Sequence, residues 1–367
     1  MGNVGDSRPV PSRRQFLFGF SATCFAASRT VPSSATRYND PATEFPILRL
    51  TDPAFTSVLP AHYQRAIARR GNNLLFSSDL GGRMDAYRME LKSGIAHQIT
   101  EEEGLDPSSV TFGADERSVC CIANGRLLLI NTAGGRVREI YRVPEGFQPA
   151  GGTSVSEDGL YAALIERRDS SHRLRLIRMA DGTATTIAEA SEEMRDPIPR
   201  PKRASVLYRR GKGLWLANYD GHQAYSFRLA EGEAVSATWS PDGRSVFYLN
   251  YPAEPRRLHN IREFTPDTNE DKPVADTTQF VAFERNADAS VFTGASGSKA
   301  SPHVLLLVRA VKREMTLCEH RASDPTMVSP IFSPDSQHVY FVSDRHGKPA
   351  IYSIAVEKLV SETGTDQ

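Results

Sequence analysis

Three short runs decide the fold: Asn73-Leu-Leu-Phe-Ser-Ser-Asp79, Asp85-Ala-Tyr-Arg-Met-Glu-Leu91 and His97-Gln-Ile-Thr100. Gly81-Gly82 separates the first run from the second, and Gly94 separates the second from the third. Alternating or β-branched apolar residues bounded by turn residues are typical of strands joined by hairpins. This stretch therefore predicts three consecutive antiparallel strands of one small sheet.

The same unit recurs along the chain at a nearly constant spacing. Near the C-terminus, His338-Val-Tyr-Phe-Val-Ser-Asp344 is followed by Gly347 and then by Ala350-Ile-Tyr-Ser-Ile-Ala-Val356. The second strand of each unit is expected to start near seven positions: Asn73, Ser118, Leu160, Ala204, Arg244, Ala289 and Gln337. Seven such units are what a seven-bladed propeller needs, because packing the sheets around an axis covers their faces. We therefore predict an all-β fold, a seven-bladed β-propeller of four-stranded antiparallel blades.

Three segments outside the repeat complete the predicted domain organisation. Ile47-Leu-Arg-Leu50 precedes the first unit, so it is expected to pair with the last blade and close the ring. The charged, proline-containing stretch 259–279 is expected to enlarge blade five or to link it to blade six. The propeller is predicted to span residues 45–360, followed by a polar tail over residues 361–367.

Charge and cysteine content narrow the classes of function. The 367 residues contain 44 Lys and Arg and 44 Asp and Glu, a net charge of zero that argues against a nucleic-acid or membrane-surface binder. No run of 18 apolar residues occurs, so no transmembrane span is expected. Cys24, Cys120, Cys121 and Cys318 lack metal-site spacing. Cys120 and Cys121 are adjacent in a predicted strand, so their thiols are expected to be buried on opposite faces of its sheet.

Residues 1–35 have the order of a bacterial export signal. Ser12-Arg13-Arg14-Gln15-Phe16-Leu17 matches the twin-arginine pattern, and an apolar stretch and a small, polar run follow it. Cleavage after Ala26, Ala27 or Ala35 fits this order. The signal segment therefore predicts export through the twin-arginine machinery to the periplasm or the cell exterior.

Several blade segments resemble the oligogalacturonate lyases. They are residues 74–100, 138–144 and 213–221, and the segment from Leu317-Cys-Glu-His320 to Tyr352. The resemblance covers about residues 45–358, and some of the same turn units also occur in TolB-like periplasmic propellers. It implies a carbon–oxygen lyase acting on polysaccharides, which cleaves short oligogalacturonate fragments by β-elimination in pectin breakdown. It also implies a divalent cation such as manganese and a histidine base.

The family's functional positions carry other residues in this chain. The resemblance places the four metal ligands at Ala282, Asp324, Met327 and Ser329, and the base within Ser236-Ala-Thr-Trp239. Only Asp324 suits a hard cation, because such ions prefer several carboxylate or carbonyl oxygens. The sequence therefore predicts no metal at these positions and no other cofactor, and it leaves the catalytic residues unassigned.

Two groups of basic residues are candidates for binding an acidic oligosaccharide. His259, Arg262 and His320 lie around blades five to seven and are also the candidates for a catalytic role. A histidine there would titrate near neutral pH, and an arginine would bind a carboxylate in bidentate fashion. Basic residues expected on or near one rim form the second group: Arg83, Arg209, Arg210, Arg345 and His346. Each of these residues also fits a structural role, either as a hydrogen-bonded histidine or as a charge in a turn.

Three functions remain open from the sequence. The first is the family reaction, β-elimination of oligogalacturonate. The second is a non-catalytic, exported TolB-like propeller that binds sugars or proteins. The third is a lyase for another uronate, with a relocated base and no metal. Detection of an unsaturated uronate product separates the lyases from the binder.

Overall fold

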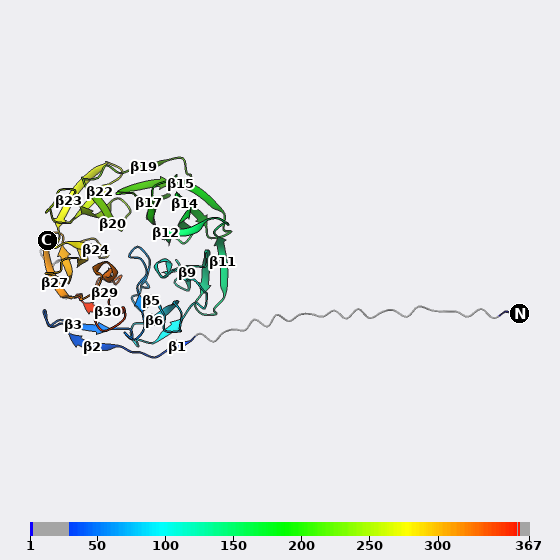
Figure 1. Cartoon of the computed structure of the whole chain (residues 1–367), viewed down its shortest axis with the longest axis horizontal. Coiled ribbons are helices and arrows are strands. Elements are labelled where there is room, and N and C mark those ends of the chain that lie inside the picture. Colours follow the sequence, from blue (N-terminus) through cyan, green and yellow to red (C-terminus); the bar gives the residue numbers. More distant parts are fainter. Residues whose placement is uncertain (3–28, 358, 360–367) are drawn as a thin grey trace.

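In the computed structural model, seven small antiparallel sheets form a closed ring around a central channel (Figure 1). The structure describes residues 1–2, 29–357 and 359. Arg13 and Arg14 of the predicted signal and the predicted tail 361–367 lie outside the described residues. Each sheet is one blade, so the predicted all-β, seven-bladed propeller is confirmed.

Blades 1 to 3 follow one another along the chain, each with its first strand on the channel. Blade 1 has β4 (Ser57–Val58), β5 (Asn73–Ser78), β6 (Asp85–Glu90) and β7 (Ala96–Gln98), with β1 (Thr30–Val31) added outside β7. Blade 2 has β8 (Thr111–Phe112), β9 (Ser118–Ala123), β10 (Arg126–Asn131) and β11 (Val137–Arg142). Blade 3 has β12 (Gln148–Val155), β13 (Tyr161–Arg168), β14 (Ser171–Arg178) and β15 (Ala184–Ala190).

Blades 4 to 6 repeat the four-stranded plan. Blade 4 has β16 (Met194–Pro199), β17 (Ser205–Arg210), β18 (Gly213–Asn218) and β19 (Ala224–Ser226). Blade 5 has β20 (Glu233–Trp239), β21 (Val246–Tyr251), β22 (Asn260–Thr265) and β23 (Glu270–Asp276). Blade 6 has β24 (Phe280–Arg285), β25 (Val291–Ser296), β26 (His303–Val308) and β27 (Arg313–Glu319). The prediction for stretch 259–279 was wrong, because it forms the ordinary third and fourth strands of blade 5.

Blade 7 is built from both ends of the propeller. Its strands β28 (Ile331–Phe332), β29 (His338–Ser343) and β30 (Ala350–Ala355) are joined by β3 (Pro46–Arg49) and β2 (Thr36–Asn39). Ile47 pairs with Ile354, and Leu50 N donates a hydrogen bond to Ile351 O at 2.8 Å, so the predicted ring closure is confirmed. Because β1 and β2 extend blades 1 and 7 to five strands, the propeller begins before the predicted boundary at residue 45.

Seven apolar clusters of buried side chains lie between neighbouring blades in the described part of the chain. Cys121 packs in the cluster between blades 1 and 2, whereas Cys120 packs in the cluster between blades 2 and 3. The expected burial of these two thiols on opposite faces is therefore confirmed. Two short 3₁₀ helices, η1 (Pro107–Ser109) and η2 (Pro325–Val328), precede β8 and β28. No helix in the described part is long and apolar enough to cross a membrane.

Candidate functional site in the central channel

Residues 59–72, which join β4 to β5 and are called the crossing segment below, pass through the inside of the ring (Figure 1). Hydrogen bonds tie the segment to blade 2, with Arg65 N donating to Thr111 Oγ1 at 3.1 Å and Phe112 N donating to Arg65 O at 3.0 Å. Gln64 Nε2 donates to Ser108 O at 3.2 Å and also to Thr153 O in blade 3. The channel is therefore partly filled by the chain itself.

Apolar side chains explain why the crossing segment holds this path. Leu59, Ala66 and Ile67 are buried in the cluster between blades 7 and 1, next to the strand that the segment leads into. Tyr63 reaches across the channel and packs against the cluster between blades 4 and 5. The segment is thus anchored at its ends beside β5, while its middle lies against the opposite side of the ring.

His62 and Tyr63 place polar groups at the centre of the channel. His62 Nε2 lies 3.0 Å from Ala237 O and 3.3 Å from Ser236 Oγ, both on β20. The two rings of His62 and Tyr63 meet edge to face, with centroids 5.2 Å apart. Burial raises the pKa of Tyr63 well above its usual value, and Asp196 and Asp106 add to this effect, so its hydroxyl is protonated at neutral pH.

A cavity of about 490 Å³ beside Tyr63, called the acidic cavity below, is lined mainly by residues of blades 3 and 4. Its arginines are neutralised, since Arg209 pairs with Asp196 at 2.6 Å and Arg195 pairs with Glu193 at 2.7 Å. Asp106 adds a further carboxylate to the lining. This cavity does not suit a uronate, because like charges oppose one another at close range.

Two adjoining cavities have volumes of about 470 and 210 Å³, and His62, Arg65 and Arg285 line both of them. The two cavities together are called the basic cavity below. Backbone carbonyls hold both guanidinium groups. Arg65 donates to Gly113 O at 3.0 Å and to Glu157 O at 3.4 Å, while Arg285 donates to Trp239 O at 2.6 Å and to Asn286 O at 3.0 Å. Neither forms an ion pair with a carboxylate within 4.0 Å among the described residues, although Glu157 acts electrostatically on Arg65 and Glu284 on Arg285.

Burial shifts the pKa values of two groups in the basic cavity. It lowers the pKa of Arg65, and the like charge of Arg69 acts in the same direction. Burial also raises the pKa of Glu284, whose Oε1 accepts hydrogen bonds from Thr238 Oγ1 and from the Arg285 backbone N–H. Its Oε2 is buried without a hydrogen-bond partner. The cavity therefore combines Arg65, a cation that burial partly desolvates, with a buried acid that has unused hydrogen-bonding capacity.

The positions to which the resemblance assigns metal ligands do not fit a divalent cation. Asp324 caps η2, and its Oδ1 accepts hydrogen bonds from Thr326 N at 2.9 Å and Thr326 Oγ1 at 2.8 Å. Ala282, Met327 and Ser329 offer only a methyl group, a thioether and a hydroxyl. No group of three His, Cys, Asp or Glu side chains in the described part of the chain could hold a metal ion. We therefore derive no step through a metal.

His259, Arg262 and His320 each have partners within the protein. Burial lowers the pKa of His259, which stacks on Tyr251 and contacts Phe280 O through Nδ1 at 2.7 Å. Arg262 is paired with Asp271 at 3.1 Å. His320 is buried, with Nδ1 accepting from Ala322 N at 3.0 Å and Nε2 donating to Ser296 O at 2.9 Å. Since both ring nitrogens of His320 are engaged, its geometry is that of a structural histidine.

The predicted rim cations have partners within the protein. Arg83 pairs with Asp85 at 3.1 Å, and Arg210 pairs with Glu192 at 2.6 Å. The Arg345 guanidinium is buried, lies 3.7 Å from Asp40 and donates to Glu319 O at 3.0 Å. His346 Nδ1 lies 2.8 Å from Tyr352 Oη. These contacts give these side chains structural roles in turns and at blade edges. The sequence alone shows that the residues are basic, but it does not show their partners.

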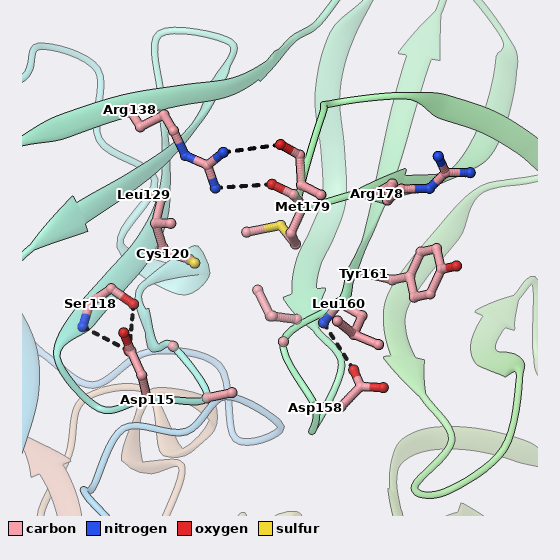
Figure 2. Close-up of a pocket in the computed structure, with 15 residues that line it drawn as sticks. Asp115, Ser118, Cys120, Leu129, Arg138, Asp158, Leu160, Tyr161, Arg178 and Met179 are labelled. Atoms are coloured by element: carbon pink, nitrogen blue, oxygen red, sulfur yellow. Dashed lines mark hydrogen bonds between the residues drawn. The ribbon is translucent and has the colours of Figure 1, made fainter.

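A groove of about 420 Å³ lies between blades 2 and 3, and its charged side chains already have partners within the protein (Figure 2). Arg138 spans it and donates to Met179 O at 3.0 Å and to Ala180 O at 3.2 Å. Asp115 and Asp158 accept hydrogen bonds from residues of their own turns. Burial raises the pKa of the Cys120 thiol to about 12, so this thiol is not a ready nucleophile. The basic cavity is therefore the stronger candidate site.

The fold and this site define a closed propeller whose channel holds a cavity lined by arginines. The family model described as oligogalacturonate lyase matches residues 25–304, and the chain belongs to that family. It is 24% identical to an oligogalacturonide lyase of Pectobacterium atrosepticum, over 89% of this chain and 97% of the relative. It is 25% identical to an oligogalacturonate lyase of Dickeya dadantii, over 86% of this chain and 94% of the relative. A solved structure of oligogalacturonate lyase in complex with manganese superposes with a TM-score of 0.84 at 24% identity, over 90% of this chain and 98% of that one.

Sequence reasoning missed His62, Arg65 and Arg285 as site residues. His62 and Ser236 are 174 positions apart, and only the path of the crossing segment brings them together. A usable signal was present, because the linker between the first two strands of blade 1 is much longer than the other linkers at this position. Long loops in compact domains are frequently functional.

Proposed function

We propose that this protein is a carbon–oxygen lyase that cleaves short oligogalacturonate fragments by β-elimination in its basic cavity. The observation that carries the proposal is that backbone carbonyls hold the guanidinium groups of Arg65 and Arg285, which form no ion pair with a carboxylate among the described residues. Membership of the oligogalacturonate lyase family supports the same substrate class.

The chemistry of β-elimination needs such cations. The proton on C5 of a uronate is weakly acidic, and its removal places negative charge on the adjacent carboxylate. Guanidinium groups held in place beforehand stabilise this developing charge without reorganising during the reaction. An arginine also suits a planar carboxylate because it offers two parallel N–H donors. Arg65 and Arg285 therefore supply electrostatic stabilisation from the protein itself.

Formation of an unsaturated product tests the proposal. Purified protein is incubated with oligogalacturonate, and the ultraviolet absorbance of the new carbon–carbon double bond is followed. We expect absorbance to grow in proportion to protein concentration. If it does not grow while calorimetry shows that the oligosaccharide binds, the protein is a sugar-binding propeller instead. That alternative is favoured by the residues that replace the family's metal ligands, Ala282, Met327 and Ser329.

A further inference from the structure

His62 lies beside the segment to which the resemblance assigns the base. Residues 236–239 read Ser-Ala-Thr-Trp and include no histidine. The crossing segment brings the His62 ring to this segment from the opposite side of the ring of blades, with Nε2 at 3.0 Å from Ala237 O and 3.3 Å from Ser236 Oγ. An imidazole therefore occupies this part of the channel although β20 does not carry it.

The hydrogen bond to Ala237 determines which nitrogen of His62 can accept a proton. A carbonyl oxygen can only accept, so Nε2 carries the hydrogen in this contact. In the neutral ring the lone pair then lies on Nδ1. No hydrogen bond among the described residues engages Nδ1, and His62 lines both parts of the basic cavity. A backbone carbonyl thus orients the ring and fixes its tautomer, as is common for functional histidines.

The neighbours of His62 suit a base that acts on an anionic substrate. The other titratable groups lining the basic cavity are Tyr63, Arg65, Arg69, Glu157, Glu284 and Arg285. Among these, the unpaired guanidinium groups of Arg65 and Arg285 can hold a uronate carboxylate. If a uronate carboxylate binds there, its C5–H bond lies in the same cavity, whose wall includes His62.

We infer that His62 is the general base of the β-elimination, an assignment that rests on the lyase function proposed above. Nδ1 takes the proton from C5, and the electrons of the C5–H bond form the double bond between C4 and C5. The C4–O bond breaks as this double bond forms, and the leaving oxygen takes a proton from water. His62 then returns its proton to water, so the enzyme is unchanged after one cycle.

The first test replaces His62 with a side chain that forms hydrogen bonds but cannot take up the C5 proton. His62→Gln keeps an N–H donor for Ala237 O, so the crossing segment retains its contact. We expect kcat to fall about 100-fold or more, the usual contribution of a general base, with KM nearly unchanged. The acidic limb of the pH profile of kcat/KM is expected to disappear. His222→Gln, in an exposed loop of blade 4, is the matched control and keeps wild-type kinetics.

A second variant tests the position of the base. In His62→Ala/Ser236→His the imidazole comes from β20 into the same space, so we expect at least 10-fold higher kcat than in His62→Ala. Circular-dichroism melting confirms that each variant is folded, and His62→Asn replaces His62→Gln if the latter melts early. Unchanged kcat or an unchanged acidic limb in a folded His62→Gln protein overturns the assignment while the lyase function stands. Absence of unsaturated product from the wild-type protein overturns the lyase function itself.

Discussion

At the scale of single residues, an arginine can bind an anionic ligand only if no carboxylate of the protein already neutralises its charge. Arg83, Arg209 and Arg210 are on the surface or in a cavity, but each pairs with a carboxylate within 3.1 Å. The guanidinium group of Arg285 donates hydrogen bonds only to carbonyls among the described residues. The type of hydrogen-bond acceptor, which a sequence does not display, therefore separates structural arginines from candidate ligand-binding ones.

Replacing Arg285 with methionine is expected to weaken substrate binding. Arg285→Met keeps much of the apolar stem but removes a charge-assisted contact of about 1.5–3 kcal/mol, which corresponds to about a 10- to 100-fold loss in kcat/KM. Steady-state kinetics on oligogalacturonate measures the change. Arg244→Met is the control, because Arg244 is exposed and its 3.5 Å contact with Asp242 lies in a turn. Equal kinetics for Arg285→Met and the wild-type protein would remove Arg285 from the site.

The three described cysteines are expected to resist alkylation in the folded protein. Cys120, Cys121 and Cys318 are free and buried, and burial raises the pKa of each thiol far above neutral pH. The reactive thiolate is therefore scarce in the native state. Iodoacetamide treatment at neutral pH followed by peptide mass spectrometry should find these residues unmodified until denaturant is added. Rapid native labelling of any of the three would contradict the burial described above.

At the scale of elements, the repeat was predictable and the crossing segment was not. All seven predicted starts of second strands lie within two residues of the observed ones, because hairpin turns and alternating apolar residues are local signals. The path of residues 59–72 depends on the packing of Tyr63 against the apolar cluster between blades 4 and 5. Such a long-range contact leaves no periodic pattern, so the candidate base could not be placed from sequence.

Gly152 in β12 is expected to control the position of the crossing segment. A Cβ added at Gly152 would lie 2.3 Å from Tyr63 Oη, and the residue has a φ of +108°, which strains any other side chain. Gly152→Ala should therefore displace Tyr63 and its neighbour His62, lowering both the melting temperature and kcat. Gly82→Ala is the matched control, because Gly82 also has a positive φ of +93° but a Cβ there meets nothing within 4 Å. Calorimetric melting and kinetics would refute this coupling if the two variants behaved alike.

At the scale of the whole molecule, the N-terminal strand limits where a signal peptide can be removed. We propose export through the twin-arginine machinery on the basis of Arg13 and Arg14. Cleavage after Ala26 or Ala27 leaves β1 in place, whereas cleavage after Ala35 removes it from blade 1. Because β1 adds hydrogen bonds to an otherwise open sheet edge, we expect the earlier cleavage, and N-terminal sequencing of the mature protein identifies it.

Replacing both signal arginines with lysine is expected to retain the protein inside the cell. The twin-arginine pattern requires the guanidinium pair, so Arg13→Lys/Arg14→Lys keeps the charge and removes the recognised feature. Cell fractionation and immunoblotting compare the two proteins. A double-lysine variant that still reaches the periplasm would show that another route carries the chain.

The balance of charge over the whole molecule predicts how ligand binding depends on salt. The net charge is zero, so long-range attraction of an anionic sugar is weak and affinity must come from the basic cavity. Contacts with exposed cations such as Arg69 contribute about 1 kcal/mol or less and are screened by salt, whereas the desolvated Arg65 is screened less. Calorimetric titration with oligogalacturonate should therefore show a modest loss of affinity between low and moderate ionic strength.

The same titration with a chelator distinguishes arginines from a bridging metal as the source of affinity. Asp324 is engaged as a helix cap, and Ala282, Met327 and Ser329 are poor ligands for a hard cation, so we expect the chelator to leave the affinity unchanged. Chelator-sensitive binding would mean that a metal bridges protein and sugar elsewhere in the chain. Binding that is absent at every ionic strength would instead favour a protein partner, because the unneutralised charge of Arg65 and Arg285 would then serve an acidic surface and not a uronate.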